Sequence, residues 1–157
     1  MLDFGGLHTD GLFNFEAYFY IPSGNSAYFN MQGAAVIGTT WALDVYMNTD
    51  ASIDVSSGGV NILSSDIPND EWFKVAFVIN LTTNNWQFLL NDVSLGSWAN
   101  AVNQISMFDF YPATANDLFY VDDVAYSLED YVLQNLNASV QTLSIGAIGV
   151  VGLEKVP

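Results

Sequence analysis

The chain has 157 residues and contains no cysteine. This absence excludes a disulfide framework, a zinc site built on thiolates and a cysteine nucleophile. It does not assign the protein to a reducing compartment. A domain of this length buries roughly two thirds of the surface that its unfolded chain exposes, so one sizeable core can stabilise it without cross-links.

Positive charge is also scarce. The only basic side chains besides His8 are Lys74 and Lys155, and 17 acidic residues give a formal net charge of -15. Nucleic-acid binding needs cations that displace phosphate counterions, and an anionic membrane surface needs a basic patch, so we expect neither partner. A surface rich in Asn, Ser, Thr, Gln and Asp suits an extracellular or cell-surface setting, where divalent cations screen the acidic charge, and simple solubility is the alternative explanation. Composition alone leaves a cytosolic location open.

Two further features are missing. No apolar run reaches the 18 or so residues of a membrane helix, so we expect no membrane insertion, and Met1 is not followed by the pattern of a signal peptide. The single histidine, His8, lies in a Gly-rich opening without a serine-histidine-acid signature, so a histidine-based mechanism has no support.

The strongest pattern that is present covers residues 70–98. Alternation with period two predicts a strand at 72–81 with one fully apolar face, formed by Phe73, Val75, Phe77, Ile79 and Leu81. A turn at 82–85, a return strand at 86–90, a tight turn at Asn91 and Asp92 and a third strand at 93–98 follow. Such a meander needs a second layer to cover its apolar face.

The same alternation recurs along the chain. It predicts further strands near residues 13–21, 27–31, 41–48, 53–55, 60–63, 105–111 and 118–126. Roughly ten short strands with few helical patterns indicate an all-β fold, an antiparallel two-sheet β-sandwich. A short helical turn is expected around residues 128–133.

The last segment has a different character, because residues 137–151 are apolar, Gly-punctuated and almost uncharged. A flat uncharged strand templates pairing with another strand. We therefore divide the chain into a sandwich at 1–135 and a terminal strand segment at 136–157. The segment is either an edge strand of its own domain or a strand exchanged with a neighbouring copy or a neighbouring domain. The residues that would mediate this assembly are Val140, Leu143, Ile145, Ile148 and Val150.

Several segments together resemble a known module. They are FNFEAYFYIPSGNSAYFNMQG from Phe13, the strand that begins at Trp41, DEWFKVAFVINLTTNNWQFLLND from Asp70 and FYPATANDLFYVDDVAY from Phe110. They resemble the laminin G-like, concanavalin A-like jelly-roll module of secreted bacterial proteins, often those exported by the type IX pathway. The resemblance covers about residues 2–130 and implies a jelly roll with a carbohydrate-binding, adhesive or spacing role and no catalysis.

The chain departs from that family in two ways. Family members usually have Asn-Gly where this chain has Asn91 and Asp92, and they usually have an initial strand before the segment that starts here at Leu2. A strand missing at the start and a surplus strand at the end would complement each other, either within one domain or between copies. Head-to-tail contacts that do not close produce a filament.

Aromatic residues are the candidates for glycan contact, because their rings combine flat apolar area with a polar tip. We predict ligand-binding roles for Tyr28, Tyr46, Trp98 and Tyr111, with core packing as the alternative. The other tryptophans, Trp41, Trp72 and Trp86, are predicted to pack.

Acidic pairs suggest two other sites. Asp122 and Asp123 are candidate calcium ligands, since calcium binds clustered oxygens. Because neighbours on a strand point to opposite faces, one of the two is expected to face inward, where it would alternatively accept backbone hydrogen bonds from a loop. A glycosidase would need two carboxylates that flank a sugar, and Glu16 and Asp44 on neighbouring strands are the candidates. No clustered Glu-x-Asp pattern supports this, so we predict no enzymatic activity.

The sequence thus predicts a non-catalytic extracellular module that binds glycans or cell-surface components. The alternatives are a filament subunit that assembles with copies of itself by exchanging its terminal strand and, more remotely, a glycoside hydrolase.

Overall fold

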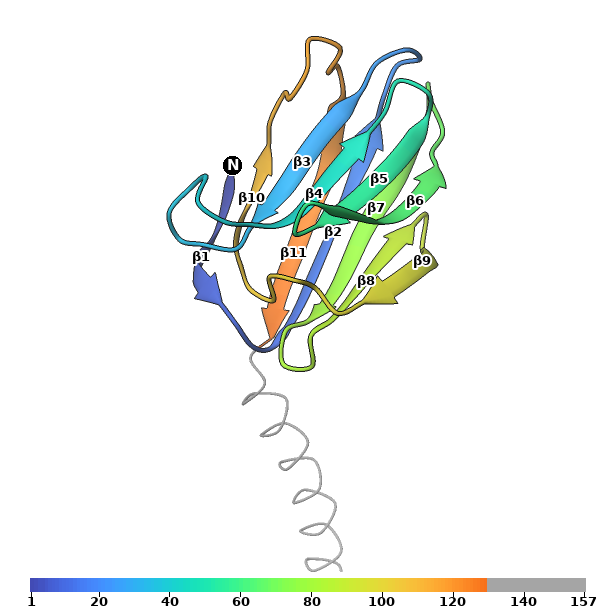
Figure 1. Cartoon of the computed structure of the whole chain (residues 1–157). Coiled ribbons are helices and arrows are strands. Elements are labelled where there is room, and N and C mark those ends of the chain that lie inside the picture. Colours follow the sequence, from blue (N-terminus) through green and yellow to red (C-terminus); the bar gives the residue numbers. More distant parts are fainter. Residues whose placement is uncertain (130–157) are drawn as a thin grey trace, which may run out of the picture.

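Strands, several of them with alternating inward and outward side chains, build the structure, a computed structural model of which residues 1–129 are described (Figure 1). No helix is present in that range. The strands are β1 (Leu2–His8), β2 (Leu12–Tyr20), β3 (Ala27–Gln32), β4 (Trp41–Met47), β5 (Ser52–Ser57), β6 (Val60–Asp66), β7 (Trp72–Asn80), β8 (Asn85–Leu90), β9 (Val93–Trp98), β10 (Ile105–Phe110) and β11 (Tyr120–Glu129).

The strands form two antiparallel sheets that pack face to face, as Figure 1 shows. One sheet has six strands in the order β1-β10-β3-β4-β5-β6, and the other has five in the order β11-β2-β7-β8-β9. The chain crosses between the sheets several times, for example from β9 to β10. The predicted all-β, two-sheet jelly-roll sandwich is therefore confirmed.

The core lies between the sheets and is dominated by phenylalanine. The rings of Phe15 and Phe29, one from each sheet, lie 4.2 and 4.7 Å from the ring of Phe108. All three side chains are almost completely buried. Burying each such side chain stabilises the fold by about 1.5–3 kcal/mol. Because successive side chains point to opposite faces of a sheet, the residues that alternate with these buried ones lie on the outer faces.

The central hairpin follows the prediction closely. The inward residues of β7 alternate as expected, and the tight turn before β9 has positive φ at Asn91 (48°) and Asp92 (66°). The backbone N–H of Lys74 donates to the Asn91 side chain over 2.8 Å, which ties the turn to β7. Asn and Asp tolerate this left-handed conformation better than other non-glycine residues.

Strand β1 was not predicted from the sequence. It pairs with β10 at one edge of the six-stranded sheet and places Phe4 in the core. Gly5 and Gly6 both adopt positive φ inside the strand, and the register shifts between Asp3 and His8. This irregularity removes the period of two by which strands are recognised in a sequence.

The tryptophan predictions need correction. Trp86 is completely buried, as predicted, but Trp41 and Trp72 are 43% and 49% exposed. A bulge between Met31 and Gln32 shifts the register opposite Trp41 and turns its side chain outward. Trp72 begins β7 on the outer face, beside Tyr20.

Some predictions concern residues at or beyond the end of β11. Leu128 and Glu129 belong to β11 rather than to a helical turn, and residues 130–133 of that predicted turn lie outside the described residues. The boundary at 135 and the proposed strand-exchange residues between Val140 and Val150 lie there as well, so these remain predictions. Within residues 1–129, nothing helical is long and apolar enough to cross a membrane.

Candidate functional site

The outer face of the six-stranded sheet carries a groove of about 530 Å³ over β10, β3 and β4. We call it the six-strand groove. Its walls come from the loop between β3 and β4 and from the loop that follows β10. Its lining includes Tyr28, Asn30, Gln32, Ile37, Gly38, Trp41, Asp44, Tyr46, Asp109, Tyr111 and Ala113.

Strand register arranges the groove in rows. Tyr46 of β4 lies opposite Tyr28 of β3, and their rings are 4.9 Å apart. Tyr111 follows Phe110, whose partner on β3 is Phe29, so Tyr111 lies at the level of Tyr28. Tyr28 and Tyr46 on adjacent strands, and Tyr111 just after β10, therefore form an aromatic row across one end of the groove.

The next row contains two carboxylates and an amide. Asn30 pairs with Asp44 on one side and with Asp109 on the other. Adjacent strands lie about 4.8 Å apart, so the two aspartates are separated by about 10 Å along this row. Gln32 and Trp41, which are also paired, extend the groove beyond it.

Side chains of β3 that point away from the core are nevertheless buried. Tyr28, Asn30 and Gln32 are only 8%, 3% and 1% exposed, because the groove walls cover them. The Gly38 N–H donates to Gln32 Oε1 over 3.1 Å, Gln32 Nε2 donates to Asn30 Oδ1, and the Tyr28 hydroxyl donates to Asp44 Oδ1 over 2.6 Å. These bonds satisfy the buried polar groups and fix the floor.

Two tyrosines of the groove have raised pKa values. Burial raises the pKa of the Tyr28 hydroxyl, and its hydrogen bond to the Asp44 carboxylate raises it further. Burial and the nearby Asp44 charge also raise the pKa of Tyr46. Both hydroxyls therefore stay protonated at neutral pH and act as neutral hydrogen-bonding groups.

Asp117 holds the wall that carries Tyr111 and Ala113. Its carboxylate accepts hydrogen bonds from Ser26 Oγ, from the N–H of Ala113 and, over 2.9 and 3.1 Å, from the N–H and hydroxyl of Thr114. Burial alone would raise the pKa of Asp117, but these hydrogen bonds outweigh it and hold the pKa below its ordinary value.

Exposed aromatic rings stand beside these polar groups. Trp41, Tyr46 and Tyr111 are 43%, 41% and 56% exposed at the groove. Sugars present apolar ring faces together with hydroxyl groups. Flat aromatic area next to fixed carboxylate and amide groups complements both parts of such a ligand.

The structure brings together three of the four residues predicted to bind ligand: Tyr28, Tyr46 and Tyr111. Trp98 lies apart from them, at the end of β9 in the other sheet. It is half-buried against the core, and its Nε1 donates to Asn100 Oδ1 over 2.8 Å. This bond anchors the crossing from β9 to β10.

Sequence reasoning missed Asn30, Gln32, Asp109 and the exposure of Trp41. For β3 a signal was available, because Tyr28, Asn30 and Gln32 are polar positions that alternate with apolar ones. The position of Asp109 depends on the pairing of β10 with β3, which are far apart in the sequence.

Neither aspartate of the predicted pair on β11 faces the core. Asp122 and Asp123 are both exposed, so the prediction that one faces inward is wrong. The register shifts between Asp122 and Ala125, and Asp123 has a φ of 48°, which interrupts the alternation. The described residues contain no group of three or more His, Asp or Glu side chains that could hold a metal ion.

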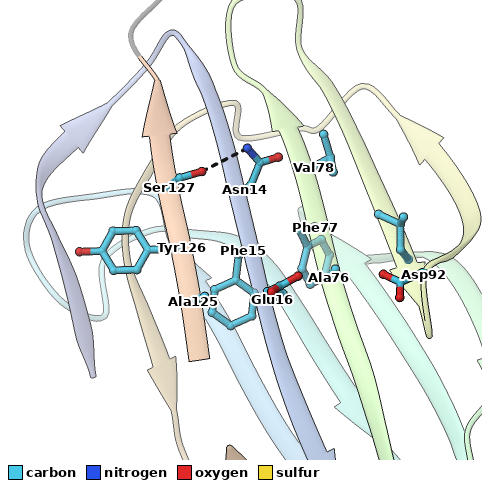
Figure 2. Close-up of a pocket in the computed structure, with 11 residues that line it drawn as sticks. Asn14, Phe15, Glu16, Ala76, Phe77, Val78, Asp92, Ala125, Tyr126 and Ser127 are labelled. Carbon is cyan, nitrogen blue, oxygen red and sulfur yellow. Dashed lines mark hydrogen bonds between the residues drawn. The ribbon is translucent and has the colours of Figure 1, made fainter. Parts of the chain in front are cut away.

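A second hollow, of about 400 Å³, lies on the outer face of the five-stranded sheet (Figure 2). Small residues such as Ala76, Val78 and Ala125 form its floor, and Asn14 bonds to Ser127 across its rim. Figure 2 shows Tyr126 at its edge, where the ring lies 4.9 Å from that of Phe4. This hollow therefore lacks the row of aromatic rings that the six-strand groove has.

The carboxylates of this second hollow are already paired. Lys74 Nζ lies 3.5 Å from Glu16 Oε2 and forms a second ion pair with Asp92. Glu16 is on β2 and Asp44 on β4, in different sheets and on opposite outer faces. The prediction that they lie on neighbouring strands is therefore wrong, and they do not form an acid/base pair.

Solved structures of known proteins share the fold at low sequence identity. A sialidase matches with a TM-score of 0.59 and 11% identity over 82% of this chain, which spans only 15% of the sialidase. A galectin from Caenorhabditis elegans matches with a TM-score of 0.54 and 10% identity over 81% of this chain and 94% of its own. An alginate lyase of polysaccharide lyase family 7 matches with a TM-score of 0.53 and 12% identity, over 78% and 62%.

No family model matches the chain, and no curated protein matches it in sequence. The similar structures show that the chain has the fold of a jelly-roll sandwich. This confirms the general part of the resemblance. The laminin G and type IX secretion assignments remain predictions.

Proposed function

We propose that this protein is a non-catalytic carbohydrate-binding module that holds a glycan in the six-strand groove. The observation that carries the proposal is the arrangement of Trp41, Tyr46 and Tyr111 around the row of Asp44, Asn30 and Asp109. Exposed rings supply apolar stacking area, and the fixed polar row supplies orientation. Similar structures that include a galectin agree with this proposal at the level of the fold.

Binding without hydrolysis fits the chemistry of the floor. A glycosidase needs one carboxyl group that delivers a proton to the glycosidic oxygen and a second that acts as base or nucleophile. Asp44 accepts a hydrogen bond from Tyr28, so the floor itself orients this carboxylate. We extend the proposal to an extracellular or cell-surface setting, in which the module attaches its protein to glycans.

Substitution of Trp41 tests the proposal, and Trp72 provides a matched control. Both tryptophans are about half exposed, but Trp72 lies on the other sheet, outside the groove. On a panel of immobilised glycans, Trp41→Ala should weaken binding at least tenfold, because losing the burial of such a ring costs about 1.5 kcal/mol or more. Trp72→Ala should leave binding within about twofold of the original chain.

Two results would count against the proposal. One is the absence of saturable binding to any glycan of the panel. The other is equal loss of binding in both tryptophan variants, which would mean that the groove is not the site. Release of reducing ends from a bound glycan would contradict the non-catalytic part alone.

A further inference from the structure

The charged side chains that line the six-strand groove are both carboxylates, Asp44 and Asp109. The positively charged amino nitrogen of Met1 lies 4.0 Å from Asp109 Oδ1. Lys74 lies on the opposite sheet, where Glu16 and Asp92 pair with it. In the described part of the chain, the groove therefore has no basic side chain in its lining.

Three hydrogen bonds join polar groups of the floor to one another. Gly38 donates to Gln32, Gln32 donates to Asn30, and Tyr28 donates to Asp44. These donors are used within the protein, while a carboxylate has two oxygens and about four acceptor positions. The carboxylates of Asp44 and Asp109 thus present acceptors to a ligand. They fit ligand groups that donate hydrogen bonds, namely hydroxyls and ammonium groups.

The two carboxylates flank Asn30 on adjacent strands, about 10 Å apart along the row. A chain-like ligand that crosses β4, β3 and β10 passes both of them. Trp41 stands at one side of this path and Tyr46 and Tyr111 at the other, so the sugars that stack on the rings lie near a carboxylate.

We propose that the six-strand groove selects glycans by charge, so that amino-sugar chains bind more tightly than neutral chains and chains bearing carboxylates are excluded. This inference rests on the proposed glycan-binding function. An ammonium group next to Asp44 or Asp109 gains a charge-assisted hydrogen bond. A uronate carboxylate beside Asp44 meets a like charge, and the groove lining has no basic side chain to neutralise it. Beside Asp109 the amino group of Met1 offsets part of the charge. The net charge of -15 adds repulsion at longer range.

Three hexasaccharides of equal length test the selection by titration calorimetry on the full chain: the glucosamine hexamer, the N-acetylglucosamine hexamer and the galacturonate hexamer. A mildly acidic buffer keeps the amines protonated and the uronates ionised. At about 0.02 M salt, we expect the glucosamine hexamer to bind about tenfold more tightly than its N-acetylated counterpart, as one favourable charge pair would give. At about 0.5 M salt this ratio should shrink, and the galacturonate hexamer should not bind at either concentration.

A pair of variants separates the groove from the overall charge. Asp109→Asn and Asp10→Asn each remove one negative charge, but Asp10 lies exposed in the turn between β1 and β2, outside the groove lining. Asp109→Asn should reduce the preference for the amine several-fold, and Asp10→Asn should leave it unchanged. An equal effect of both variants would attribute the preference to net charge and overturn the inference.

The remaining outcomes separate this inference from the proposed function. Equal affinity for the two glucosamine-based hexamers, or binding of the galacturonate hexamer, would overturn charge selection while glycan binding stands. If none of the hexamers binds but other neutral glycans of the panel do, the amino-sugar assignment is wrong. If no glycan binds at all, the inference and the proposed function both fail.

Discussion

Tyr28 shows how single residues define the groove. Its ring lies on the outer face of β3, yet it is nearly as buried as the core, and its hydroxyl holds Asp44 in place. A tyrosine at this position supplies apolar area, a donor and rigidity together, whereas a longer flexible side chain would lose more conformational entropy on ordering. Asp117 likewise fixes the wall beside Tyr111, through the hydrogen bonds that its carboxylate accepts from Ser26, Ala113 and Thr114.

Acid should loosen that wall. The pKa of Asp117 is lowered in the folded state, so the unfolded chain, with a pKa near 3.9, binds more protons as pH falls through this range. Its contribution to stability is therefore complete above about pH 4 and is lost as pH falls further toward the folded pKa. Thermal unfolding followed from pH 7 to pH 2 should show a plateau and then a decline that is shallower in Asp117→Asn.

Asp54 gives a comparison within the same experiment. Its pKa is lowered chiefly by the hydrogen bond from Ser64, with burial opposing it and Asn48 and Asn61 adding to it. Asp54 lies on β5 opposite Tyr46, apart from the wall that Asp117 holds. Asp54→Asn should also make the acid decline shallower, but without loosening the wall that carries Tyr111 and Ala113. An unchanged acid profile in Asp117→Asn would contradict the role given to Asp117.

At the scale of elements, the loop between β3 and β4 forms one groove wall and depends on a close approach at Gly33. The Gly33 N–H donates to the carbonyl of Thr40 over 2.8 Å, and its carbonyl accepts from Gln104. A Cβ atom at Gly33 would lie 2.8 Å from Val102 Cγ1. Glycine therefore lets this loop lie against the segment that leads into β10.

Gly33→Ala should accordingly destabilise the fold by about 1–3 kcal/mol, the usual cost of overpacking. The double variant Gly33→Ala with Val102→Ala removes the methyl group in the way, so it should recover part of this loss relative to the sum of the single changes. Urea unfolding of the four proteins of the cycle measures this. Strict additivity would show that the Val102 contact is not the cause.

The elements differ in how far the sequence determines them. β7 and β8 could be predicted because each has one apolar face, and the turn at Asn91 and Asp92 because those residues accept positive φ. β1 could not, since two glycines with positive φ break its alternation. A register shift likewise hid the outward position of Trp41, because the bulge between Met31 and Gln32 interrupts the alternation there.

The groove was only partly predictable for a related reason. Residue type alone pointed to Tyr28, Tyr46 and Tyr111, because tyrosine suits a half-buried site. The acidic row required knowing that β10 and β4 both flank β3, and a long-range pairing of this kind leaves no local pattern in the sequence. Register, rather than composition, joins Asp44 to Asp109.

At the scale of the whole molecule, the two outer faces of the sandwich are chemically different. The six-stranded sheet presents exposed rings beside two carboxylates of a covered polar floor. The five-stranded sheet presents a small-residue hollow whose carboxylates are paired with Lys74, and it also carries the rings of Tyr120, Tyr20 and Trp72 on adjacent strands. A net charge of -15 acts on both faces alike. The row of Asp44, Asn30 and Asp109, rather than aromatic rings, therefore distinguishes the face on which we propose that a glycan binds.

The most direct test is an NMR titration of the isotopically labelled full chain with the tightest-binding glycan of the panel. The account predicts saturable shifts of backbone amides around Asn30, Asp44 and Asp109, with those around Ala76 and Ala125 unchanged. Shifts confined to the five-stranded sheet, or no saturable shifts in the six-strand groove, would contradict the central claim.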